Sequence, residues 1–282
     1  MRWRLAFAAL VVAYALLISP FTQYLKNRPV EVKLGYLPHP QLLRVASGEH
    51  RPTVAGLAVV RVLFYFGTIL QKLQENVVIQ PEFYNMYKTL QGAVHVDPYN
   101  MDAYYFAQAA FTWEVGRVNE VNHLLEKGVA HRTWDPWLPF YLGFNYAYFL
   151  NDYSKAASYM QHAAEISGNP LFAQLAARYF YESEQSAMGL AFLETMIRTS
   201  KDKVVRQAYE LRYEALTAVT VIEGALEVFR TRFGELPSEL SLLVRSGLLS
   251  ELPADPYGGT FYLDEQGKVR STSQFVTSSN DG

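Results

Sequence analysis

The sequence of 282 residues contains no cysteine. This absence excludes disulfides, thiolate metal sites, attached c-type haem and cysteine nucleophiles. An excess of charge of one sign is also missing, because 25 Lys and Arg face 27 Asp and Glu, and the net charge of −2 provides no general basic field for nucleic acid. The six histidines are scattered singly along the chain.

Sequence patterns that carry catalytic chemistry are absent as well. The chain has no phosphate-binding loop of the G-x-x-x-x-G-K-[ST] type, no dinucleotide-binding fingerprint, no H-E-x-x-H and no G-x-S-x-G. We therefore predict that the protein is not an enzyme and that it needs no cofactor and no metal.

What the sequence does have begins at its amino terminus. Arg2 and Arg4 precede an apolar run that extends from Leu5 to Leu25, about the ~20 residues needed to cross the hydrocarbon core of a membrane. No small-residue cleavage site follows the run. We predict that residues 1–28 are an uncleaved signal anchor in a bacterial inner membrane, with the bulk of the chain periplasmic. A cleaved signal peptide and a buried helix are the alternatives.

Residues 29–53 are predicted to be an extended linker, since Val30, Val32 and Leu34 alternate with polar residues before two prolines. The next segment, Val54–Leu73, is strongly apolar and is interrupted by Arg61. It is short for a second membrane span, so we predict a buried core helix.

A repeated spacing dominates the middle of the chain. Small residues recur 35 residues apart at Ala93, Gly128 and Ala163. Helix pairs with a period near 34 residues are typical of tetratricopeptide repeats. The segment "NDYSKAASYMQHAAEISGNP" (151–170) resembles the second half of such a repeat, and "YYFAQAAFTWEVGRVNEVNHLLEKGV" (104–129) resembles another. The resemblance implies an all-α superhelix of stacked helix pairs, with a non-repetitive helical bundle as the alternative.

The predicted array occupies residues 54–233 and ends in one long helix, because apolar residues recur at three- and four-residue steps from Lys201 to Phe233. A closing helix of this kind covers the last face of a repeat array.

Residues 234–282 are predicted to be a separate tail with a short helix and a β-hairpin whose turn contains Asp264 and Gly267. The order of these elements, with "LPADPYGG" between them, resembles the carboxy-terminal part of type II secretion major pseudopilins. The chain lacks their prepilin cleavage motif and their calcium loop, so Asp255 is predicted to form a turn and not to bind metal. A hairpin that only caps the last helix is the alternative.

The tetratricopeptide resemblance also implies which residues meet a partner, because the first helix of each pair lines the concave side in that family. It assigns partner binding to the following side chains: Tyr105, Gln108, Thr112, Tyr141, Asn145 and Tyr148. Structural packing of the same residues is the alternative. The predicted function is a non-enzymatic, membrane-anchored scaffold or adaptor for a protein of a bacterial envelope assembly (pilus, secretion or export). The alternative function is a ligand- or glycan-sensing accessory subunit of a membrane transporter.

Overall fold

The computed structural model describes residues 2–27 and 33–275. The predicted boundary between anchor and linker at residues 28 and 29 lies outside the described residues, as do residues 276–282. Most described residues are helical, and one small antiparallel sheet of two strands lies near the carboxyl terminus, which confirms the predicted mixture of elements. The chain forms two compact units, Met1–Arg132 and Thr133–Gly282, so the division lies inside the predicted 54–233 array.

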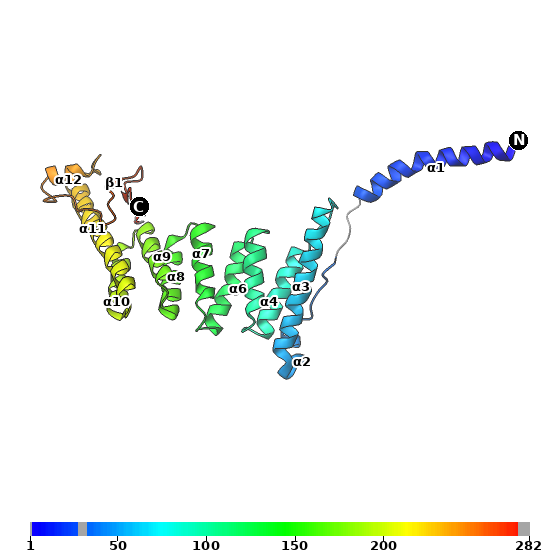
Figure 1. The fold of residues 1–282 in the computed structure, drawn as a ribbon, viewed down its shortest axis with the longest axis horizontal. Helices are drawn as coiled ribbons and strands as arrows, with labels where there is room; N and C mark the ends of the chain where they lie inside the picture. The colour runs from blue at the N-terminus through cyan, green and yellow to red at the C-terminus, as the bar shows by residue number, and fades with distance from the viewer. Residues whose placement is uncertain (1, 28–32, 276–282) are drawn as a thin grey trace. The chain divides into compact units, whose positions relative to one another are not determined.

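Unit 1 contains the first group of helices (Figure 1). They are α1 (Arg2–Asn27), α2 (Pro40–Ser47), the 3₁₀ turn η1 (Gly48–His50), α3 (Arg51–Gln74), α4 (Phe83–Val96), α5 (Met101–Phe106), the π-helical segment η2 (Ala107–Phe111) and α6 (Val118–His131). The predicted linker 29–53 thus contains α2 and η1, and its described extended part is residues 33–39.

Two apolar helical stretches of unit 1 are relevant to the predicted membrane anchor. Among the described residues, one helical stretch, Pro40–Gln74, is long and apolar enough to cross a bilayer, and 33% of its most apolar window is buried inside the structure. A shorter apolar stretch, Leu10–Tyr24, lies in α1. The choice of α1 as the membrane anchor therefore stays a prediction.

The helix α3 departs from the prediction of a core helix on one side. One face is buried, with Val62 and Ile69 at 0% and 1% exposure. The opposite face leaves Leu57 63% and Phe64 75% exposed. Because apolar residues surround much of this helix, the sequence could not separate a face buried in its own chain from a face left open.

The extended segment 33–39 is fixed to unit 1. The Glu82 carboxylate accepts hydrogen bonds from the backbone N–H groups of Leu34 (3.0 Å) and Gly35 (3.1 Å), and also from Asn85 Nδ2 (3.0 Å). Arg61 donates to the Leu34 carbonyl. These charge-assisted bonds, together with the burial of the Leu34 side chain, hold the segment between α3 and α4.

Unit 2 is a series of helix pairs in which each helix packs on the next. It contains α7 (Trp137–Tyr148), α8 (Tyr153–Ser167), α9 (Pro170–Glu182), α10 (Ser186–Thr199), α11 (Lys203–Phe233), α12 (Ser241–Arg245), β1 (Phe261–Leu263) and β2 (Val269–Ser271). The helices α6, α8 and α10 begin 35 and 33 residues apart, close to the predicted period.

Local signals explain where the helices of unit 2 begin and end. Asp202 caps α11 by accepting hydrogen bonds from Val204 N (2.8 Å) and Val205 N (3.2 Å), and Gly234 ends it with φ +83°. Small residues let the helices approach closely, as at Gly143, which is not part of the 35-residue series found in the sequence. A Cβ on Gly143 in α7 would lie 2.9 Å from the Met160 side chain of α8.

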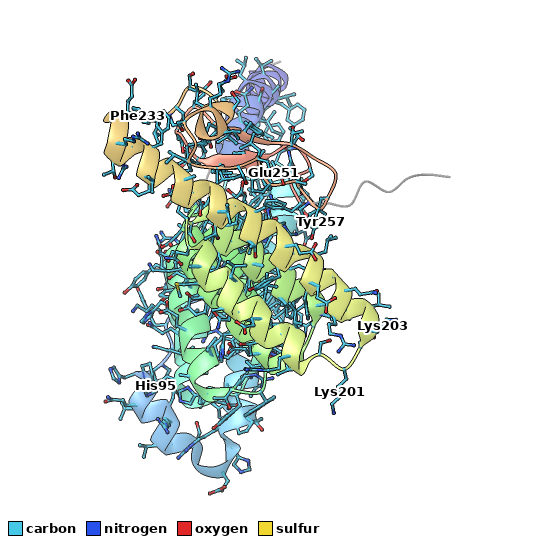
Figure 2. The ribbon with its side chains drawn as sticks, turned by 90° about the vertical axis from the view of Figure 1, so that its left-hand side faces the viewer. His95, Lys201, Lys203, Phe233, Glu251 and Tyr257 are labelled. Atoms are coloured by element: carbon cyan, nitrogen blue, oxygen red, sulfur yellow. The ribbon has the colours of Figure 1, made fainter. Side chains whose placement is uncertain are left out.

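The tail covers parts of α9 and α11. The hairpin pairs Phe261 with Ser271 and Leu263 with Val269, as predicted from the turn residues. Tyr181 of α9 donates to the Val269 carbonyl (2.5 Å), and Arg270 binds Glu182 of α9 (2.6 Å). Figure 2 shows α11 running from Lys203 to Phe233 with Tyr257 of the tail beside it.

Asp255 organises the tail as a turn-former. Its Oδ1 accepts from Tyr257 N (2.9 Å), and its Oδ2 accepts from the hydroxyls of Ser271 and of Ser273, the latter at 2.6 Å. Gly259 packs so closely here that a Cβ would lie 2.6 Å from both Asp255 Oδ2 and Ser273 N. The buried carboxylate is therefore satisfied by the tail itself.

Candidate functional site

The predicted partner-binding residues divide into exposed and buried sets. Tyr105 in unit 1 and Tyr148 in unit 2 are 60% and 62% exposed, and Tyr141 is half-buried. The side chains of the remaining three residues are buried: Gln108, Thr112 and Asn145. A partner can therefore contact the exposed tyrosines directly, whereas the three buried side chains serve packing.

The buried pair in unit 1 lies at an irregularity of the backbone. Thr112 Oγ1 donates to Gln108 Oε1 at 3.4 Å, beside the π-helical segment η2 that continues α5. Such segments are rare, and a sequence pattern of ordinary helical period does not predict them.

An aromatic face runs along α7 in unit 2. Phe140 stacks on Phe172 of α9 with ring centroids 5.0 Å apart, and Phe144 stacks on Tyr148 at 5.3 Å. Trp137 lies 5.9 Å from Phe172 and is 50% exposed. The spacing of three and four residues along α7 is the signal in the sequence, although Tyr148 is the one member of this set that was among the predicted partner-binding residues. This face combines rigid rings with partial exposure, as protein-binding surfaces often do.

A pocket of about 290 Å³ in the same unit is formed by α9, α11 and the tail. Its lining is mixed apolar and cationic and consists of Leu171, Gln174, Leu175 and Arg178 from α9, Ala208, Leu211 and Arg212 from α11, and Tyr257 and Phe275 from the tail. No Asp or Glu is among these lining residues. Leu171 at its edge is 54% exposed and directly precedes Phe172 of the aromatic contacts.

Arg212 forms the buried side of the pocket. Its Nη2 donates to the Phe275 carbonyl (3.0 Å), and its guanidinium lies 5.2 Å from the ring centroids of both Tyr257 and Phe275. Its Nε and Nη1 have no hydrogen-bond partner in the described part of the chain. Burial lowers the pKa of Arg212 from its ordinary value, while Tyr257 and the nearby Asp255 carboxylate act in the opposite direction. A guanidinium that is desolvated in this way favours a nearby anion.

Arg178 supplies a second, exposed cation at the same pocket. The two arginines stand on facing helices, and the positive field of Arg178 further lowers the pKa of Arg212. The pocket can therefore accept an apolar side chain together with a carboxylate, for which an arginine fork is the usual partner.

Neither arginine was predicted from the sequence. Arg212 interrupts the apolar stripe of α11, and a charge at such a position is the one signal that could have drawn attention to it. Its surroundings depend on Tyr257 and Phe275, which lie 45 and 63 residues further along the chain. No group of three or more metal-binding side chains occurs in residues 2–27 and 33–275.

A second pocket, of about 520 Å³, lies in unit 1 beside the fixed segment 33–39. Tyr36 and Tyr84 line it and are 82% and 63% exposed. The Lys88 ammonium lies 5.6 Å from the centroid of the Tyr84 ring.

Comparisons of the chain with protein-family models, with curated proteins and with solved structures find no match. The resemblances to tetratricopeptide repeats and to pseudopilins thus stay predictions.

Proposed function

We propose that this protein is a non-catalytic adaptor, anchored in a bacterial inner membrane by α1, whose tetratricopeptide-like helix pairs bind a partner protein of an envelope assembly in the periplasm. The observation that carries the proposal is the pocket between α9 and α11, whose lining combines apolar residues with two arginines and includes no acidic residue.

The recognition mode follows from the chemistry of this pocket. A partner segment places an apolar side chain against Leu171 and Leu175 and a carboxylate at Arg178. Hydrogen bonds to charged groups contribute about 1.5–3 kcal/mol, so the carboxylate sets the specificity of the site while the apolar contact supplies buried area. The exposed rings of Trp137 and Tyr148 extend the surface along α7. Anchoring the chain in the membrane raises the local concentration of adaptor and partner.

Photo-crosslinking in intact cells tests the proposal with the full chain. A photoreactive amino acid at Leu171 is expected to crosslink to a protein of the cell envelope. Arg178→Glu is expected to reduce the yield about tenfold, which corresponds to about 1.4 kcal/mol of binding free energy. Met188 on α10 is the matched control position, because its side chain has the same 54% exposure as Leu171 but does not line the pocket.

Equal crosslinking from both positions, or a Leu171 crosslink that Arg178→Glu leaves unchanged, would contradict the adaptor function. The second candidate, a ligand- or glycan-sensing subunit of a transporter, is favoured by the larger pocket with its two exposed tyrosines in unit 1. It requires a small molecule that stays bound through purification and is lost on Tyr84→Ala.

A further inference from the structure

The open face of α3 carries a regular seam of residues. Gly56, Val60, Leu63, Gly67, Leu70 and Gln74 follow one another at alternating steps of four and three residues. This is the heptad spacing of a helix that packs along its length against another helix. We call these six residues the outer seam of α3.

The outer seam has no cover within the described chain. Val60, Leu63 and Leu70 are 43%, 44% and 40% exposed, and flanking Phe64 is 75% exposed. A Cβ built on Gly56 or Gly67 meets no atom within 4 Å. The other side of α3 packs in unit 1 on α4 and α5, so the seam is a second apolar surface on the same helix. Exposed apolar surfaces of this kind are typical of protein–protein or membrane interaction sites.

The seam is complementary to itself. In an antiparallel pair of heptad helices, each layer joins a first-position residue of one helix to a fourth-position residue of the other. With the two-fold axis midway between Leu63 and Gly67, Leu63 faces Gly67 of the other copy twice, and Val60 faces Leu70 twice. Gly56 faces Gln74. Each glycine thus receives a longer side chain, and the same surface serves both partners, as a two-fold interface requires.

Charge does not oppose this pairing. The outer seam contains no ionisable residue, and α3 has no Asp or Glu. Arg61 donates to the Leu34 carbonyl of its own chain, and Lys72 pairs with Glu75 at 2.8 Å. Phe64 beside the seam faces its own counterpart near the axis, which buries the most exposed apolar ring of the helix against another ring.

We infer that a second copy of this chain covers the outer seam and that the protein is an antiparallel two-fold dimer through α3. A lipid surface is the competing occupant, because α3 is also apolar enough for a bilayer. The two occupants make opposite demands on Gly67. A bilayer binds a larger apolar residue more tightly, whereas a close helix pair has no room for it.

Gly67→Leu in the full chain, purified in detergent, is the decisive variant. Its backbone is helical and its surroundings are open, so the variant is expected to fold. Sedimentation velocity is expected to show a dimer for the wild type and at least a tenfold weaker dimer for Gly67→Leu. Gly224→Leu on α11 is the matched control, since Gly224 is also an exposed helical glycine with no atom within 4 Å of its Cβ, and it is expected to leave the dimer intact.

Crosslinking in membranes provides a second measurement that does not depend on detergent. The chain has no cysteine, so Phe64→Cys introduces a single thiol near the proposed axis. A short bifunctional maleimide is expected to join two copies, whereas Val228→Cys on α11, with 52% exposure, is expected to give little product. A wild-type monomer in both measurements, equal crosslinking at both positions, or tighter vesicle binding by a monomeric Gly67→Leu variant would overturn the dimer.

Discussion

The long helices α3 in unit 1 (24 residues) and α11 in unit 2 (31 residues) have different surroundings. On α11, Leu226 and Phe229 are 6% and 9% exposed because α9, α10, α12 and the tail surround that side of the helix. On α3, Leu57 and Phe64 are 63% and 75% exposed. A helix at the end of a series needs a cover, and the chain provides one for α11 from its own tail.

The difference lies in the extra chain that follows α11. The described residues after Gly234, 235–275, contribute a short helix, a hairpin and a buried Asp255. They contact α9 through the bonds of Arg270 to Glu182 and of Val269 to Tyr181. The described residues on the amino-terminal side of α3 are different. The segment 33–39 lies along one side of the helix and is held there by Arg61 and Glu82, which leaves the outer seam open.

The largest effect on stability is expected from Gly259→Ala, which adds one methyl group to the tail that covers α11. In Gly259→Ala, the new Cβ lies 2.6 Å from a backbone nitrogen and from Asp255 Oδ2, so the tail must rearrange. We expect unit 2 to lose about 3 kcal/mol of its free energy of unfolding, measured by urea denaturation. Hydrogen exchange is expected to become faster in the tail and in the last turns of α11, which would make this helix resemble α3.

The control for this variant is Gly224→Ala, which adds the same methyl group to α11 where nothing lies within 4 Å. A Gly259→Ala variant as stable as Gly224→Ala would mean that the tail tolerates the methyl group and that close packing at Gly259 is not what holds the cover in place.

The sequence predicts α11 and the tail that covers it better than it predicts the surroundings of α3. Asp202 and Gly234 delimit α11, and Asp264 and Gly267 define the hairpin, because capping and turn formation are local properties. The environment of Arg212 could not be predicted, since it depends on where the tail packs. On α3, a nearly continuous run of apolar residues hides two separate stripes, and only the structure shows which one is buried.

The substitutions Gly224→Ala in α11 and Gly67→Ala in α3 allow the stability of the two helices to be compared directly. Gly224 in α11 and Gly67 in α3 are both exposed and helical with open surroundings. Alanine is expected to stabilise each helix by about 0.5–1 kcal/mol in dilute protein, measured by thermal unfolding. At concentrations where the wild type dimerises, the gain from Gly67→Ala is expected to shrink because the methyl group enters the outer seam. A gain at Gly67 that is independent of concentration would indicate that no second helix approaches it.

The two helices also differ, by a smaller amount, in how their stability depends on pH. Glu223 of α11 lies in a cleft of about 360 Å³ beside the hairpin, together with Glu184, Lys268 and Arg230. Burial raises the pKa of Glu223 from its ordinary value of 4.5, and the negative charge of Glu184 raises it further. Lys268 pairs with Glu184 at 2.6 Å. No carboxylate exists in α3, so this dependence on pH belongs to the covered helix alone.

The smallest effect is expected from Glu223→Gln. Because the folded state binds the proton of Glu223 more tightly than the unfolded state does, Glu223 contributes most to stability below pH 4.5, and this contribution is lost as the pH rises through the higher folded pKa. At neutral pH the wild type keeps a partly buried negative charge that glutamine does not have. We therefore expect the variant to unfold at a slightly higher temperature than the wild type at pH 7 and to lose this advantage near pH 4. An advantage that is constant over this range would show that Glu223 is solvated, and that the tail covers α11 more loosely than its hydrogen bonds imply.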